Sequence, residues 1–109
     1  MANTYKVLGQ AFPNANTNFS LYTVPAATSA IVSTLNVCNT TASNVTFRAA
    51  IRPAGEALAN KHYIVYDTAL PAQDSIALSL GMTMGNTDVL TVYSFLGNVS
   101  FNVFGTEIT

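Results

Sequence analysis

An alternation of apolar and polar residues between Val45 and Arg52 most constrains what this chain can fold into. From Val45 to Ile51 every second residue is apolar, and the residues between them are polar or small. This two-residue period is typical of a β-strand with one buried face and one wet face. It places the side chains of Arg48 and Arg52 together on the wet face.

The preceding segment, Ala30–Cys38, carries apolar residues on both sides of an extended chain. We expect Ile31, Leu35 and Val37 on one side and Val32 and Cys38 on the other. This pattern predicts a strand inside a sheet that is covered on both faces. Residues 39–44 are Asn, Thr, Ala and Ser, a composition that favours a turn. We therefore interpret residues 30–52 as a β-hairpin.

The rest of the chain repeats this design of short apolar stretches separated by turn residues. Six further strands are predicted, at residues 4–10, 19–24, 61–67, 74–80, 88–95 and 99–104. Tyr5 and Val7 are expected to share one face of the first of them. In residues 74–80 the alternation is the cleanest, with Ile76, Leu78 and Leu80 on one face.

Three stretches are predicted to lie outside these strands. Residues 53–60 form a loop with at most one helical turn, because the stretch is too short for a stable helix. Residues 81–87 form a loop bracketed by glycines, and the tail 105–109 adds a little edge strand. About eight strands without a helix predict an all-β protein, an antiparallel β-sandwich of jelly-roll or immunoglobulin-like type. At 109 residues the chain is a single domain, 1–109.

Charged residues are scarce in this sequence. Hydrophobic residues make up 50% of the chain and charged residues only 8%, about a third of the roughly 25% usual in soluble domains. A free monomer with so little charge would be poorly protected from association. We expect much of its surface to be covered by copies of itself or by a larger assembly.

The charge balance and the apolar pattern also argue against several partners. Four cations and a net charge of -1 offer no basic stripe for a nucleic acid. No apolar run is long enough to span a bilayer, and the first ten residues lack the features of a signal peptide, so we expect synthesis in a cytoplasm. Cys38 is the single cysteine, and we expect it to be a buried, inert thiol.

We expect no catalytic, cofactor or metal site. His62 and Asp67 are five positions apart in a predicted strand, which separates them by roughly 16 Å on opposite faces. Asp67, Asp74 and Asp88 with Glu56 could collect around a calcium ion, but their spacing matches no loop motif. The Tyr and Phe residues could form a sugar-binding platform or could fill a core or a subunit interface, and both readings stay open.

Short phrases along nearly the whole chain carry a resemblance to small virion proteins of tailed bacteriophages, including those that infect cyanobacteria. The phrases are Leu8-Gly9-Gln10, Leu21-Tyr22-Thr23-Val24-Pro25, Val37-Cys38-Asn39, Arg52-Pro53-Ala54-Gly55, Lys61-His62-Tyr63-Ile64, Tyr66-Asp67, Asp88-Val89 and Phe101-Asn102-Val103-Phe104-Gly105. The resemblance implies a structural β-sandwich of the particle that assembles as a symmetric oligomer, most plausibly a trimer. It implies no catalytic residues.

The leading hypothesis is a capsid decoration, or cement, protein that stabilises the shell by contacts with the major capsid protein and with its own copies. We predict Arg48 and Arg52 as exposed contact residues, together with the loop positions Phe12, Met82 and Met84. The alternative is a component of the tail, neck, baseplate or a fibre that binds host glycans. An enzyme is the third reading, and no set of residues supports it.

Overall fold

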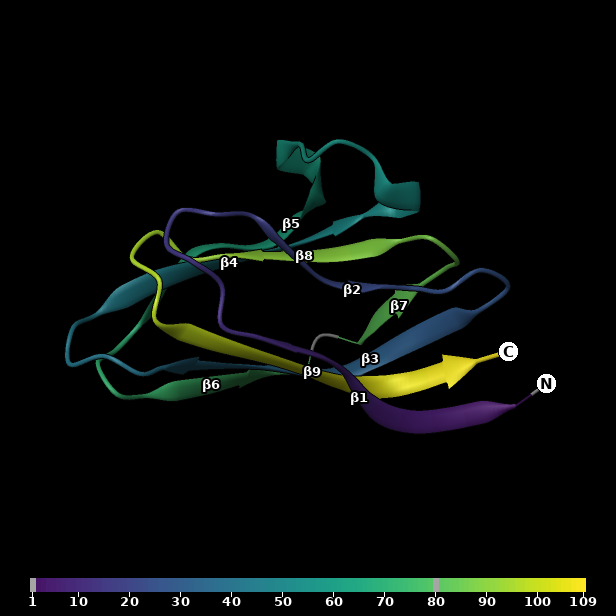
Figure 1. The fold of residues 1–109 in the computed structure, drawn as a ribbon, viewed down its shortest axis with the longest axis horizontal. Helices are drawn as coiled ribbons and strands as arrows, with labels where there is room; N and C mark the ends of the chain where they lie inside the picture. The colour runs from purple at the N-terminus through teal and green to yellow at the C-terminus, as the bar shows by residue number, and fades with distance from the viewer. Residues whose placement is uncertain (1, 80) are drawn as a thin grey trace.

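The computed structural model describes residues 2–79 and 81–109 of the chain (Figure 1). The described residues form nine strands and two short 3-10 helices. They are β1 (Asn3–Ala11), β2 (Phe19–Thr23), β3 (Ser29–Asn39), β4 (Val45–Arg52), η1 (Pro53–Gly55), η2 (Asn60–His62), β5 (Tyr63–Leu70), β6 (Ser75–Leu78), β7 (Met82–Met84), β8 (Val89–Tyr93) and β9 (Val99–Ile108).

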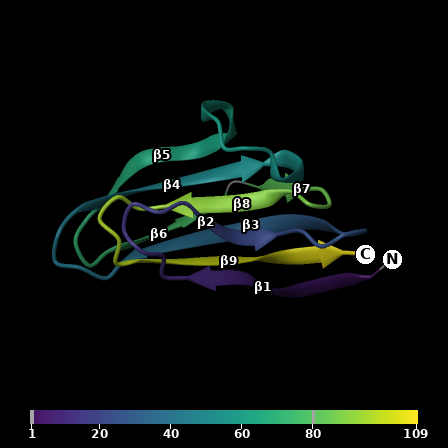
Figure 2. The same cartoon turned by 45° about the horizontal axis from the view of Figure 1, so that its top comes forward.

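The strands form two antiparallel sheets that pack face to face, seen in Figure 1 as an upper layer with β2, β8, β4 and β5 and a lower layer with β1, β9, β3 and β6. In the turned view β1 lies at one edge of its sheet with β9 beside it (Figure 2). Sheet A has the order β1-β9-β3-β6, and β7 also pairs with β3. Sheet B has the order β2-β8-β4-β5. The prediction of an all-β antiparallel sandwich is confirmed, with nine strands in the described part of the chain against the expected eight.

The core lies between the sheets and is built from the inward residues of both. Val45, Phe47 and Ala49 of β4 are buried, as the alternation predicted. Phe47 meets Phe101 of β9 edge to face, with 6.3 Å between the ring centroids. Each fully buried side chain of this size stabilises the fold by about 1.5–3 kcal/mol, so these inward rows hold the two sheets together.

The predicted hairpin over residues 30–52 is wrong, because β3 and β4 belong to different sheets. Both edges of β3 are taken, one by β9 and the other by β6 and β7, while β4 lies between β8 and β5. Alternation reports which face of a strand is buried, but it does not report which strand lies beside it. The five-residue connection, 40–44, is long enough to cross the roughly 10 Å between packed sheets.

Asn39 holds this crossing in place. Its buried side-chain amide donates to the carbonyl oxygens of Ser43, Leu70 and Pro71, at 2.7, 3.2 and 3.0 Å. Its side-chain oxygen accepts from the backbone N–H and the hydroxyl of Thr41. One side chain therefore ties the β3–β4 connection to the end of β5.

The prediction that β3 is covered on both faces is also wrong. The pairing of β3 with β9 shifts register between Val32 and Thr34. This bulge adds one residue, so Val32 and Leu35 both face the core while Ile31 is 43% exposed on the outside. Cys38 lies on the outer face as well and is partly exposed, which corrects the expectation of a buried thiol.

Gly105 of β9 lies opposite that bulge. It pairs with Val32, and a Cβ added at this glycine would collide with the carbonyl oxygen of Ile31. The close approach of two backbones therefore requires glycine at this point.

The prediction that the tail 105–109 adds a little edge strand is also wrong, because β9 continues to Ile108 and lies in the interior of sheet A between β1 and β3.

Three further strand predictions are adjusted by the structure. The predicted loop over residues 81–87 contains β7, whose Met82 and Met84 are buried. The expected strand 61–67 begins only at Tyr63, since Lys61 and His62 belong to η2. In the strand predicted over residues 74–80, Ile76 and Leu78 share the inner face, and Leu80 lies outside the described residues.

Candidate functional site

The nine charged residues are distributed unevenly over the molecule. Arg48 and Arg52 lie on the outer face of sheet B, Glu56 and Lys61 in the segment that folds back over it, and Asp67 in β5. Asp74 and Asp88 precede β6 and β8, while Glu107 lies on the inner side of sheet A and pairs with Lys6 at the exposed edge strand β1. The two outer faces of the sandwich therefore differ in charge.

Arg48 is the centre of one cluster on the outer face of sheet B. Its guanidinium lies 4.3 Å from the ring centroid of Tyr66 and 4.5 Å from that of Tyr93. The same group donates from Nε and Nη2 to the two carboxylate oxygens of Asp67, at 2.6 and 3.1 Å. The hydrogen bond from Arg48 lowers the pKa of Asp67. Two rings and a bidentate carboxylate thus hold this arginine within the chain.

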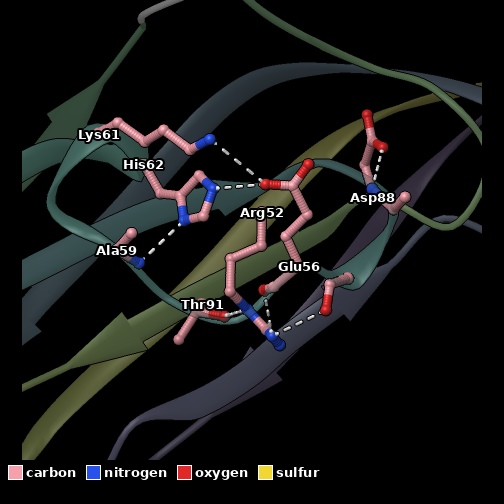
Figure 3. A network of polar contacts seen from close by, with 9 residues as sticks. Arg52, Glu56, Ala59, Lys61, His62, Asp88 and Thr91 are labelled. Atoms are coloured by element: carbon pink, nitrogen blue, oxygen red, sulfur yellow. Dashed lines mark hydrogen bonds and ion pairs between the residues drawn. The ribbon is translucent and has the colours of Figure 1, made fainter.

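Arg52 is the centre of a second cluster on the same face (Figure 3). It donates to the Thr91 hydroxyl at 3.0 Å, to the Glu56 carbonyl at 2.9 Å and to the Ser20 hydroxyl at 3.3 Å. These bonds hold the segment after β4 against β8 and β2. Arg52 is therefore a brace of the fold, and its donors are used within the chain.

The segment that contains η1 and η2 is closed by a third set of contacts, also visible in Figure 3. The buried His62 ring accepts the Ala59 backbone N–H at Nδ1, at 3.0 Å. Its Nε2 lies 3.4 Å from the Glu56 carboxylate, which also pairs with Lys61 at 3.6 Å. With Nδ1 accepting, Nε2 carries the proton and donates to Glu56. These contacts fix the shape of the segment.

A small polar group links the two sheets near the termini. The Tyr22 hydroxyl of β2 donates to Glu107 of β9 at 2.6 Å, and Lys6 of β1 pairs with the same carboxylate at 3.1 Å. Burial and the bond to Glu107 raise the pKa of Tyr22 well above its usual value. The hydrogen bond from Tyr22, together with Lys6, lowers the pKa of Glu107. The Glu107 carboxylate is therefore largely shielded from solvent and is paired with Lys6, whose side chain stays partly exposed at the edge of the sheet.

The outer face of sheet A carries no charged side chain in the part of the chain that is described. Side chains at directly paired positions share a face, so the register gives its cross-strand rows. They are Tyr5–Thr106–Ile31–Thr83, Val7–Phe104–Thr34, Gln10–Asn102–Asn36–Ala77 and Ser100–Cys38–Ser75. Two rows are rich in large apolar groups and two in amides and hydroxyls.

Apolar exposure on this face is large. Tyr5 is 79% exposed and Val7 47% exposed, and Ile31 and Phe104 lie beside them in the neighbouring strands. One side-chain bond within the face, from the Gln10 amide to Asn102 at 2.7 Å, joins two outward residues. Most of its polar groups and its apolar rows are therefore available to something outside the chain.

The structure places the five predicted contact residues in different settings. Phe12 is exposed in the connection between β1 and β2. Arg48 and Arg52 share the outer face of sheet B, as expected, but both are held by partners in the same chain. Met82 and Met84 lie in β7, are 8% and 3% exposed and pack in the core, so their prediction as loop positions is wrong.

A shallow hollow lies on the outer side of sheet B, next to the Arg48 cluster. It measures about 320 Å³ and is lined by Asn60, Tyr63 and Tyr66. The two tyrosine rings meet edge to face at 4.8 Å and form a corner. Because Arg48 covers one side of Tyr66, the rings are held in place without a ligand.

The described residues hold no group of three or more His, Cys, Asp or Glu side chains that could bind a metal ion. Within residues 2–79 and 81–109, no helix has the length and apolar character needed to cross a membrane. No family model matches this chain, and no curated protein matches it.

The uncharged face was missed at the level of sequence. A signal for it was present, because within the predicted strands 4–10 and 99–104 the single charged residue is Lys6. The pairing of β1, β9 and β3 was needed to show that their uncharged sides form one surface.

Proposed function

We propose that this chain is a structural component of a tailed-phage virion, a capsid decoration protein that stabilises the shell through protein–protein contacts. The observation that carries the proposal is the broad outer face of sheet A, which has exposed apolar rows and no charge among the described residues. Exposed apolar patches of this kind mark interaction surfaces. The resemblance of the sequence to small virion proteins supports the same reading.

In this proposal the protein stabilises the capsid by binding to it. A protein that binds only the assembled lattice stabilises the lattice by its binding free energy, and it needs no catalytic group to do so. Its partners are the major capsid protein and copies of itself in a symmetric oligomer, and neither nucleic acid, membrane nor cofactor takes part. The protein is made in the host cytoplasm and ends in the virion.

Copy number per particle tests this proposal. We expect quantitative mass spectrometry of purified virions to find this chain in near-stoichiometric ratio to the major capsid protein, because a symmetric lattice repeats its cement at each equivalent site. A few copies per particle would move it to the neck, tail or a fibre. Absence from the particle would overturn the proposal altogether.

A second candidate function is host-glycan binding from the tail or a fibre, and the hollow at Tyr63 and Tyr66 favours it. Aromatic rings can pack on the apolar face of a sugar while the Asn60 amide bonds its hydroxyls. The test is binding of the purified chain to host lipopolysaccharide by titration calorimetry. Loss of binding in Tyr66→Ala, but not in Tyr5→Ala on the opposite face, would support it, and no binding by the unmodified chain would remove it.

A further inference from the structure

We propose that the outer face of sheet A packs against the same face of a second copy of this chain. The inference deepens the proposed function by naming the partner of that face. It applies to the isolated chain, so it can fail while the virion assignment stands, and the reverse also holds. Three observations point to a second copy, namely the size of the face, its polar chemistry and the place of its apolar rows.

The face is large enough for a stable contact. Its strand β1 has nine residues and β9 has ten, and four strand positions lie side by side because β6 and β7 both occupy the same edge of β3. At standard spacings this gives a projected area of about 600 Å², before side-chain relief is counted. A standard interface buries about 800 Å² on each partner, so one face of this sheet supplies about what is needed.

The polar groups on the face suit a copy of themselves. Gln10, Asn102 and Asn36 form a row of amides, and Ser100 and Ser75 flank Cys38 in the next row. Amides and hydroxyls both donate and accept hydrogen bonds. A surface of such groups can pair with itself, whereas carboxylates or ammonium groups would face their own charge.

The charges of sheet A are directed away from this contact. Lys6 and Glu107 lie in its strands, but they pair with each other on the inner side at 3.1 Å. A charged partner would find nothing on the outer face to neutralise it. A second copy brings no charge to the contact, so the desolvation cost stays low.

The apolar rows lie together and can meet across a twofold axis. Tyr5 and Ile31 share one row, and Val7 and Phe104 share the next. In an isologous contact each of these groups meets the same set on the partner. Such a twofold contact can coexist with a threefold contact elsewhere on the chain, because dihedral symmetry combines the two.

Light scattering coupled to size-exclusion chromatography tests the proposal on the purified full chain. We expect a mass that is an even multiple of 11.5 kDa. In Ile31→Glu, which places a charge opposite its own copy, we expect that mass to halve. Ile64→Glu is the matched control, because Ile64 is 41% exposed in β5 of sheet B, against 43% for Ile31, and its mass should not change.

A monomeric or trimeric native chain would overturn the proposal, and so would an Ile31→Glu chain that kept the native mass. Circular dichroism checks that the variant folds, and Val7→Glu on the edge strand β1 replaces it if it does not. The native Cys38 thiol gives a second readout, since it lies on the same face. Its alkylation should be slower in the native assembly than in the halved one, and equal rates would count against the contact.

Discussion

The outer faces of the two sheets differ in how their polar side chains are paired. On sheet B, Arg48 and Arg52 are each bound by two or more groups of the same chain, so the charged groups of this surface have partners within the molecule. On sheet A the outward rows carry apolar, amide and hydroxyl groups, and among the described residues the Gln10–Asn102 bond is the one hydrogen bond between side chains of these rows. We infer that sheet B stabilises the chain itself while sheet A is shaped for a partner.

The two arginines that were predicted as contact residues are both held within the chain. They were predicted because arginine is favoured at interfaces. In the structure Arg48 donates two bonds to Asp67, and Arg52 donates to Thr91, Glu56 and Ser20. Their role as contact residues stays a prediction.

The largest expected effect is a loss of stability in a variant of Asn39, the residue at the connection between the two sheets. Asn39 ties the β3–β4 connection, which joins sheet A to sheet B, to the end of β5. Asn39→Ala removes the amide that binds three carbonyl oxygens, and buried unsatisfied groups cost about 1–3 kcal/mol each. We expect a loss of about 3 kcal/mol in urea unfolding. Asn44→Ala, which removes a single exposed bond to the Ala72 N–H, should cost less than about 1 kcal/mol, and equal losses would contradict this account.

A second variant would damage sheet A and spare sheet B. In Gly105→Ala the new Cβ meets the Ile31 carbonyl at the bulge, and forcing backbones apart in a packed sheet costs about 2 kcal/mol. We expect a lower melting temperature and faster hydrogen exchange in β3 and β9, with the amides of β4 and β8 less affected. Gly85→Ala is the control, because its nearest neighbour, the Asp88 carboxylate, lies 3.7 Å away. Equal acceleration of hydrogen exchange in both sheets would contradict the expectation that Gly105→Ala damages sheet A alone.

A third variant would weaken the outer surface of sheet B alone. Arg48→Lys keeps the charge but loses the planar group that stacks between Tyr66 and Tyr93 and binds Asp67 with two bonds. We expect a loss of about 1 kcal/mol at this partly exposed site. Lys61→Ala removes a solvent-exposed ion pair of 3.6 Å and should change stability by less than about 0.5 kcal/mol. The oligomeric mass should stay native in both variants.

The smallest effect at neutral pH concerns the polar group between the sheets. Because the pKa of Glu107 is lower in the folded chain than its usual value of 4.5, its contribution is present at neutral pH and is lost as the pH falls below that value. In Glu107→Gln we expect a flatter decline of the urea midpoint between about pH 5 and pH 3. Asp67, whose pKa is also lowered, should keep part of the decline. If the urea midpoint of Glu107→Gln declined with falling pH as steeply as that of the native chain, Glu107 would not be a source of the acid sensitivity.

The sequence predicted the strands well because side-chain alternation follows directly from which face is buried. Val45, Phe47 and Ala49 show this in β4. The prediction of buried faces failed where one extra residue breaks the two-residue alternation. This happens at the bulge between Val32 and Thr34, so Ile31 faces outward. It also failed at β7, where flanking glycines suggested a loop but two buried methionines form a strand.

Neighbour relations could not be predicted from the same pattern. Polar residues between β3 and β4 suit a hairpin turn and a crossing between sheets equally well, and the choice depends on the contacts of Asn39 with Leu70 and Pro71, far along the chain. The candidate site has the same limit. Its residues come from five strands, so their shared outer surface follows from register and not from any local motif.

The position of β9 sets an order of events during synthesis. All strands of sheet B (β2, β4, β5 and β8) have been synthesised once the chain reaches Tyr93. Strand β1, in contrast, has β9 as its sole strand partner among the described residues. Until β9 is in place both edges of β1 are open, and open strand edges favour aggregation. The outer surface of sheet A is complete only when β9 lies between β1 and β3, so a contact through this surface requires that β9 has been synthesised and placed.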